Sequence, residues 1–196
     1  MSGVPTLEDD KLDLAAAKAA GWSSEDLEWE IKQERAAAHL RAQDLTQAGN
    51  FWQDGLELAR AHFAENDPRL GTSLANAAYG LRAAGNNSLA DSRFAESLRV
   101  WSGYGLWIQA MPLDQRARSS LFHLRMELKH RDQYEKTARE RLRRFGEESH
   151  KAIVELAAGG PPLLRGLERW RAEKPATFSE RRKFLSACLL LVSRPE

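Results

Sequence analysis

The residue types that most often carry catalysis or bind metal ions are few and scattered in this sequence. No two of the five histidines are four residues apart, the spacing with which a helix presents two ligands to one metal ion: His39, His62, His123, His130 and His150. The sequence has no glycine-rich phosphate loop and no G-x-S-x-G or H-E-x-x-H motif. We therefore expect no enzyme activity, no metal site and no cofactor.

Two isolated groups are candidates for chemistry. His123 and Glu127 lie one helical turn apart and could meet, but such neighbours on a helix are usually solvated. Cys188 is the only cysteine, and it lies in the apolar run from Phe184 to Val192, where a thiol packs and stays unreactive. A single cysteine also excludes a disulfide bond within the chain.

The elements that position these residues are expected to be helices. Alanine, leucine, glutamate and arginine dominate the composition and β-branched residues are scarce, which favours an all-α fold. The 196 residues suffice for one large domain or two small ones. No apolar run reaches the ~18 residues of a membrane helix, and the amino terminus lacks a signal peptide pattern. We expect a cytoplasmic protein that does not enter a membrane.

The stretch from Asp67 to Trp101 predicts a helical hairpin. Small residues fill its first helix, Gly85-Asn86-Asn87 makes the turn, and Ala90, Phe94 and Leu98 give the second helix an apolar stripe.

This hairpin resembles a tetratricopeptide repeat (TPR), most closely the kinesin light chain type. The resemblance rests on an Asn66-Asp67-Pro68 lead-in, the segment from Thr72 to Asn76, the Gly85 turn, and Ala90 with Phe94. It implies a right-handed α-solenoid of about three TPR-like helical hairpins with helical caps at both ends.

The expected organisation has three parts: an N-terminal cap helix or arm at 1–22, TPR-like repeats at 23–146, and C-terminal capping helices at 147–196. The first hairpin is expected to run from a Ser23–Asp26 capping box to about Ala48, turn at Gly49-Asn50, and continue through 51–64. A third hairpin is expected at 113–129 and 134–145, with its turn at Asp132-Gln133. Helices at 147–158, 162–173 and 178–193 follow, and the last is expected to be buried as the closing helix. A homodimer contact is the alternative for that helix.

The resemblance also implies a binding surface, because the first helix of each TPR pair lines the concave side. On the well-matched hairpin the groove positions fall on Asn76, Tyr79 and Arg82, with Thr72 at the rim. Asn76 would hydrogen-bond the main chain of an extended peptide, Tyr79 would cover an apolar side chain, and Arg82 would pair with a carboxylate.

The same positions can be transferred to the first hairpin. A shift by the 36 residues between Gly49 and Gly85 (85 − 49) places Leu40, Gln43 and Thr46 on its groove face. Leu40 stands where the family has asparagine, so it either packs against a neighbouring helix or grips an apolar side chain of the ligand.

The segment from Trp101 to Pro112 interrupts the repeat pattern. Gly103 and Gly105 lie among large apolar residues: Trp101, Tyr104, Trp107, Ile108 and Met111. The two alternatives are a linker whose aromatic rings pack onto neighbouring helices and an aromatic-lined loop that contacts a ligand.

Charge is unevenly spread along the chain. Residues 1–70 hold 14 acids and 7 bases, whereas residues 111–196 hold 12 acids and 19 bases. The densest basic cluster contains Arg139, Arg141, Arg143 and Arg144, but glutamates are interleaved with it, which favours ion pairs along a solvated helix face.

The function expected from these patterns is that of a non-enzymatic scaffold, such as an adaptor, assembly factor or regulatory subunit, that binds a peptide or partner protein. The alternative is a helical-repeat protein that binds nucleic acid through its basic C-terminal half.

Overall fold

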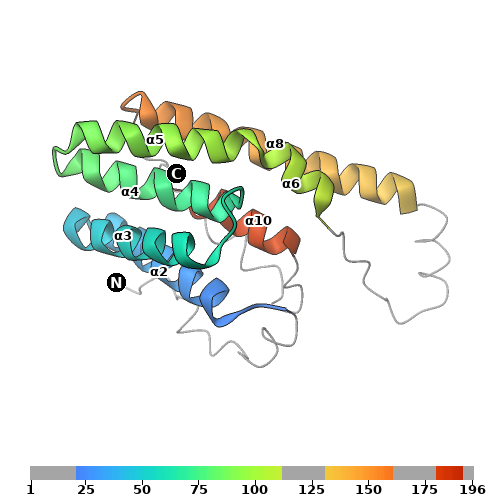
Figure 1. The fold of residues 1–196 in the computed structure, drawn as a ribbon, viewed down its shortest axis with the longest axis horizontal. Coiled ribbons are helices and arrows are strands. Elements are labelled where there is room, and N and C mark those ends of the chain that lie inside the picture. Colours follow the sequence, from blue (N-terminus) through green and yellow to red (C-terminus); the bar gives the residue numbers. More distant parts are fainter. Residues whose placement is uncertain (1–20, 112–130, 161–179, 192–196) are drawn as a thin grey trace.

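The structure is a computed structural model that describes residues 21–111, 131–160 and 180–191 (Figure 1). The regular elements in these ranges are all α-helices, in the order α2 (Ser24–Arg41), α3 (Leu45–His62), α4 (Pro68–Ala83), α5 (Asn87–Ser102), α6 (Tyr104–Ala110), α8 (Arg131–Ala157) and α10 (Glu180–Leu189). The all-α prediction is confirmed for these ranges. The solenoid and the domain boundaries remain predictions, and the helices expected within 1–20, 113–129 and 162–173 lie outside the described residues, as does His123.

The first hairpin begins as expected but turns earlier. Ser23 and Asp26 form the predicted capping box at the start of α2. The expected turn at Gly49-Asn50 is wrong, because α2 ends at Arg41 and α3 begins at Leu45. Gln43 adopts a left-handed conformation with φ 62°, and Asp44 then caps α3 by accepting a hydrogen bond from the Gln47 amide at 3.1 Å. A left-handed residue followed by an aspartate cap ends one helix and starts the next without a glycine.

Gly49 is a helix residue and not a turn residue. It lies inside α3, and a Cβ atom added to Gly80 of α4 would stand 3.3 Å from the Gly49 Cα atom. Gly80 therefore lets α4 approach α3 closely, whereas a Cβ atom on Gly49 itself would meet nothing within 4 Å.

The corrected turn changes how the two hairpins align. Their N-cap residues Asp44 and Asn86 are 42 positions apart (86 − 44), so the 36-residue shift is wrong. With the observed shift, Thr72 and Asn76 of α4 correspond to Glu30 and Glu34 of α2 (72 − 42 and 76 − 42).

The second hairpin matches the sequence-based prediction. Asp67 caps α4, Pro68 occupies its first turn, and Gly85 turns the chain with φ 83°. Inside the hairpin, the Ser97 hydroxyl donates to the Gly71 carbonyl at 2.6 Å.

Gly71 provides a test of how closely this hairpin is packed. A Cβ atom on Gly71 would meet the buried Trp101 ring at 2.7 Å, so Gly71→Ala should lower the free energy of unfolding by about 1–3 kcal/mol. In α6, a Cβ atom on Gly105 would meet nothing within 4 Å, so Gly105→Ala should raise stability by up to about 1 kcal/mol. Chemical denaturation of the two variants measures both effects, and equal effects would contradict the packing assignment.

The third hairpin differs from the prediction, because α8 is one helix of 27 residues. It passes through Asp132-Gln133 without a turn and through Gly146 without a break. Gly146 is buried, and a Cβ atom there would overlap the ring of Tyr104. The need for glycine at position 146 is therefore explained by the contact between α8 and α6 and not by a helix boundary.

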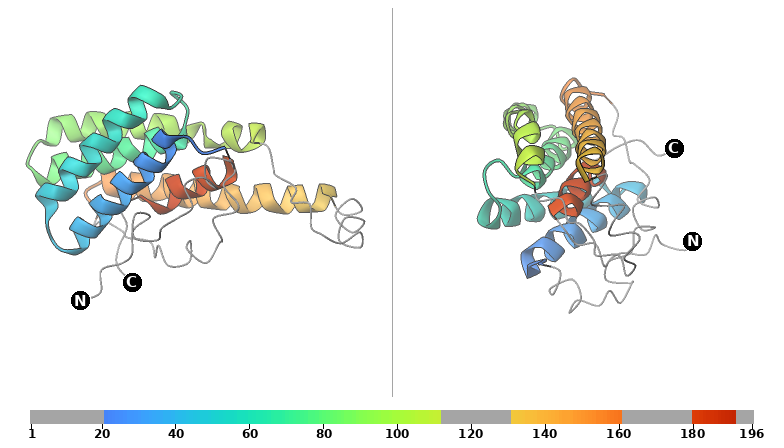
Figure 2. Two further views of the ribbon diagram at one scale, coloured as in Figure 1. Left: turned by 90° about the horizontal axis from the view of Figure 1, so that it is seen from below. Right: turned by 90° about the vertical axis from the view of Figure 1, so that its right-hand side faces the viewer.

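α10 occupies the interior of the described part of the molecule. It lies between α8 on one side and α2 on the other (Figure 2), and it packs against α4 and α8. Phe184, Ala187 and Cys188 are fully buried, as expected for the closing helix. No described helix has the length and apolar character needed to cross a membrane.

The aromatic segment 101–111 belongs to the same interior. Trp101, Ile108 and Met111 are buried, and the half-buried Trp107 ring stacks on Phe184 with centroids 5.4 Å apart. These contacts support the packing alternative for this segment.

Candidate functional site

A group of polar side chains on α2 and α4 is buried in the interior, and we call it the α2–α4 face. No member is more than 6% exposed: Asp26, Glu30, Gln33 and Glu34 on α2, and Arg69, Thr72, Ser73 and Asn76 on α4. Burying polar groups costs free energy unless each finds a partner, so their contacts determine what this face can hold.

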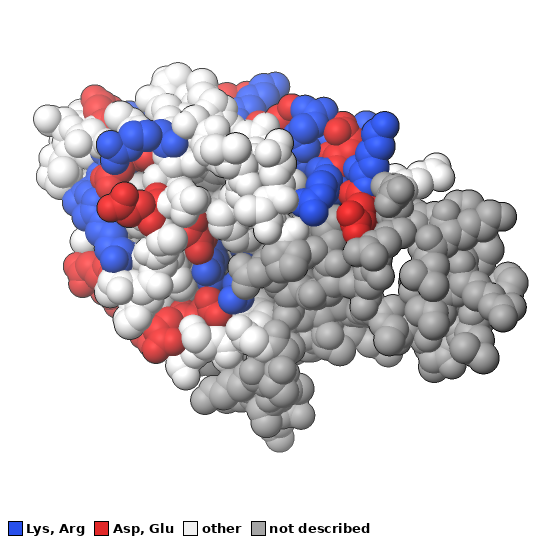
Figure 3. Space-filling view, turned by 45° about the vertical axis from the view of Figure 1, so that its right-hand side comes forward, with Lys and Arg blue, Asp and Glu red and all other residues white. Residues whose placement is uncertain are grey.

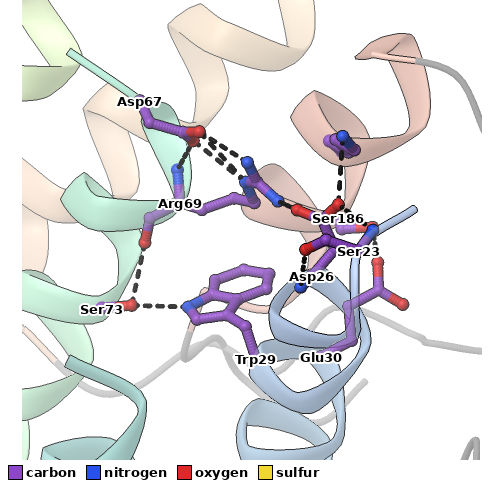
Figure 4. Close-up of polar contacts among 9 residues, drawn as sticks. Ser23, Asp26, Trp29, Glu30, Asp67, Arg69, Ser73 and Ser186 are labelled. Atoms are coloured by element: carbon purple, nitrogen blue, oxygen red, sulfur yellow. Dashed lines mark hydrogen bonds and ion pairs between the residues drawn. The ribbon is translucent and has the colours of Figure 1, made fainter. Parts of the chain in front are cut away.

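Side chains bridge α2 and α4 at three successive levels. Arg69 pairs with Asp26, the Trp29 indole donates to the Ser73 hydroxyl at 2.7 Å, and the Asn76 amide donates to the Gln33 side-chain oxygen at 2.9 Å. Figure 4 shows the first two of these contacts. The bridges give the two helices a defined register, with α4 positions 43 or 44 residues later than their α2 partners.

α10 lies on this face through main-chain contacts with α4. The Thr72 hydroxyl donates to the Ala187 carbonyl at 2.7 Å, and the Asn76 amide donates to the Leu190 carbonyl at 2.9 Å. The last carbonyl groups of a helix have no partner within it. Thr72 and Asn76 therefore cap the C-terminal end of a helix that lies 114–115 residues later in the chain.

A charged cluster fixes the other end of α10. The Lys183 ammonium lies 3.1 Å from Asp26, and the Ser186 hydroxyl donates to Glu30 (Figure 4). Arg69 joins Asp26 to Asp67, with 2.7 Å between its Nη2 atom and the Asp67 carboxylate. Its guanidinium group also lies 3.7 Å from the centroid of the Phe63 ring. These contacts show that α10 runs in the same direction as α2 and α4.

The cluster controls the ionisation of Asp26. Burial acts to raise the pKa of this carboxyl group, but the hydrogen bond from the Ser23 amide and the charges of Arg69 and Lys183 outweigh burial. The net effect is a lowered pKa, so Asp26 is held as a carboxylate at neutral pH.

The structure places the predicted groove residues of α4 on one side, but that side is not open. Thr72 and Asn76 are fully buried and hold α10, so the expectation of an unfilled groove at these residues is wrong. The half-buried Tyr79 packs edge-to-face on Trp52 at 5.8 Å. Arg82 donates to the Leu156 carbonyl of α8 and pairs with Asp91, each at 2.6 Å. Binding of a partner by these four residues remains a prediction.

The residues predicted on the first hairpin do not join them. Leu40 is buried in the core at 6% exposure, which supports the packing alternative. Gln43 lies in the turn and Thr46 in the first turn of α3, and both are exposed. The incorrect 36-residue shift selected them.

Sequence reasoning missed the acidic residues of the face. Asp26, Glu30 and Glu34 are four residues apart and share one side of α2, a pattern that is typical of a solvated helix face. The 42-residue shift identifies Glu30 and Glu34 as counterparts of Thr72 and Asn76. This shift can be found only when the turn is known to lie at Gln43.

Three of the four arginines in the basic cluster of α8 are engaged within the chain: Arg139, Arg143 and Arg144. Arg139 donates to the Ile108, Gln109 and Met111 carbonyls at the end of α6. Arg143 pairs with Glu140 and Glu147. On the face in Figure 3, basic and acidic side chains alternate where the chain is described, so no broad patch of one sign forms there.

The described residues include no group of three or more histidine, cysteine, aspartate or glutamate side chains that could hold a metal ion. Comparisons of the chain with protein-family models, with curated proteins and with solved structures find no match.

Proposed function

We propose that this protein is a non-enzymatic, TPR-like scaffold that binds a segment of a partner protein through the α2–α4 face. One observation carries the proposal: Thr72 and Asn76 donate hydrogen bonds to main-chain carbonyl groups of a segment that comes from far away in the sequence. Every polypeptide offers such carbonyl groups, so this chemistry suits a partner chain as well as the protein's own α10. An adaptor, an assembly factor or a regulatory subunit would use such a face.

The alternative function, nucleic-acid binding, has less support from the described residues. Phosphate binding needs basic side chains that can exchange bound counterions for phosphate groups. Arg139 and Arg143 instead contact carbonyl and carboxylate groups of the chain. We therefore propose the protein-binding function.

Photo-crosslinking tests the proposal. Tyr79 lies one helical turn beyond Asn76 on α4 and is only half-buried, so p-benzoylphenylalanine in its place keeps an aromatic ring beside the face. After irradiation in a nuclease-treated lysate of the native cells, we expect one stoichiometric protein adduct, identified by mass spectrometry.

The matched control carries the same crosslinker at Leu106, which is 73% exposed on α6, away from the face. The control should give no such adduct. Equal adducts from both positions, or none from Tyr79, would refute partner binding at this face.

A further inference from the structure

The α2–α4 face recognises more than main-chain carbonyl groups, because it is rich in carboxyl groups. Asp26, Glu30 and Glu34 follow one another along α2, and Asp67 caps α4 beside them. Against these four, the described residues of α2 and α4 place one buried cation, Arg69, and α10 adds Lys183. The face therefore favours a segment that brings a basic side chain and hydroxyl donors.

α10 meets these requirements with two residues on one side. Lys183 and Ser186 are three positions apart, so they share a helix side, and they contact Asp26 and Glu30. The other buried side chains of this segment are apolar: Phe184, Leu185, Ala187 and Cys188 on α10, and Leu190 and Leu191 directly after it. Lys183 and Ser186 therefore give this segment a pattern of one basic and one hydroxyl residue among apolar residues.

The two sides of the contact differ in what they lose on separation. The polar groups of the face can be hydrated when α10 leaves, so exposing them is cheap compared with exposing an apolar core surface. α10 has ten residues, fewer than the ~12–15 that a helix needs to persist alone in water, and its apolar side chains would be exposed. Release of α10 is therefore rare, unless another helix takes its place on the face.

We propose that the α2–α4 face accepts a short helix with the chemistry of α10, and that α10 holds the face closed until such a helix displaces it. The partner helix has a lysine or arginine followed three positions later by serine or threonine, with apolar residues on its other sides. Thr72 and Asn76 cap its C-terminal carbonyl groups. This inference rests on the proposed function and specifies its ligand and its regulation.

Cys188 reports the displacement directly. It is the only cysteine in the chain, it lies on α10, and it is fully buried. A thiol reagent such as Ellman's reagent reacts with it only when α10 leaves the face or the whole chain unfolds. The rate of labelling in the full-length protein therefore measures how often α10 is released.

The probe is a synthetic peptide of residues 180–191 that carries Cys188→Ser, so that it has no thiol of its own. At a concentration about ten times its dissociation constant, a peptide that binds the released state should increase labelling about elevenfold. The matched peptide with the additional change Lys183→Glu places a carboxylate against Asp26 and should leave the rate unchanged.

A control protein separates release of α10 from global unfolding. The pair Cys188→Ala and Ser97→Cys moves the single thiol to the buried contact between α4 and α5. We expect this thiol to react more slowly than Cys188, and we expect the peptide to leave its labelling rate unchanged. Equal rates for the two thiols, or equal effects of the two peptides, would overturn the inference.

The peptide experiment and the crosslinking experiment together separate this inference from the proposed function. No acceleration by the first peptide would overturn the inference while an adduct at Tyr79 still supported the proposed function. Faster labelling of Cys188 with the first peptide, but no photo-adduct at Tyr79, would support the proposed chemistry of the face and refute binding of a native partner protein there. Labelling that rises with protein concentration alone would identify a second copy of the chain as the occupant and overturn a separate partner.

Discussion

Replacing Arg69 with methionine is expected to lower the free energy of unfolding by about 3–5 kcal/mol. Arg69 is 6% exposed and pairs with both Asp26 and Asp67. Methionine retains most of the volume but removes the charge, which leaves two buried carboxylates without their shared cation. Urea denaturation followed by far-UV circular dichroism measures the loss.

Arg60→Met provides the matched control, because Arg60 also pairs with a carboxylate but lies at the surface. Its partner is Glu96 at 2.9 Å, and the two side chains are 39% and 29% exposed. Solvent screening limits such a pair to about 0–1 kcal/mol. A similar decrease in the free energy of unfolding in the two variants would show that burial does not determine how much the Arg69 cluster contributes to stability.

The pH dependence of stability gives the Arg69 experiment a second readout. Asp26 has a lowered pKa in the folded state, so its contribution is complete above the ordinary aspartate pKa of about 3.9 and is lost as the pH falls through the folded value. Arg69 and Lys183 face this carboxyl group, while Glu30 lies one turn away on α2 and Asp67 shares Arg69.

The Arg69→Met protein lacks the hydrogen bond and the charge of Arg69 that help to lower the pKa of Asp26, so we expect this pKa to be higher than in the wild type. We therefore expect this variant to lose less stability than the wild type on acidification below about pH 4, where the wild type loses the contribution of Asp26. A parallel loss in the two proteins would contradict the role of Arg69 in holding Asp26 ionised.

Phe184→Ala is expected to lower the free energy of unfolding by about 3–5 kcal/mol. Phe184 is fully buried on α10, stacks on Trp107, and lies 6.1 Å from Trp101 between ring centroids. Truncation leaves a cavity among rings that are held by α5 and α6, so the site cannot collapse fully. The same change should accelerate labelling of Cys188, because it weakens the apolar contacts of α10.

The control for Phe184 is Phe145→Ala on α8. Phe145 is 36% exposed, so its truncation should change stability by about 0.5 kcal/mol or less. Equal losses at the two positions would contradict the assignment of α10 to the core.

Local sequence signals predicted the hairpin of α4 and α5 because its determinants lie within a few residues of one another. The Asp67 cap, Pro68 in the first turn and Gly85 with positive φ each act on the adjacent backbone. The capping box of α2 was predictable for the same reason. Glycines were less informative: Gly49 and Gly146 suggested a turn and a break, yet both lie inside helices, and at Gly146 a Cβ atom would overlap the Tyr104 ring.

The sequence by itself determined the all-α class of the described ranges, the second hairpin, and the burial of the apolar residues from Phe184 to Cys188. Only the tertiary structure decided what covers the α2–α4 face. Spacing placed Thr72 and Asn76 on one side of a helix, but a helix side is open or closed according to which distant segment packs on it, here Ala187 and Leu190. The buried acids of α2 follow the same rule, because a stripe of charge looks solvated in sequence until a basic residue from another helix is brought against it.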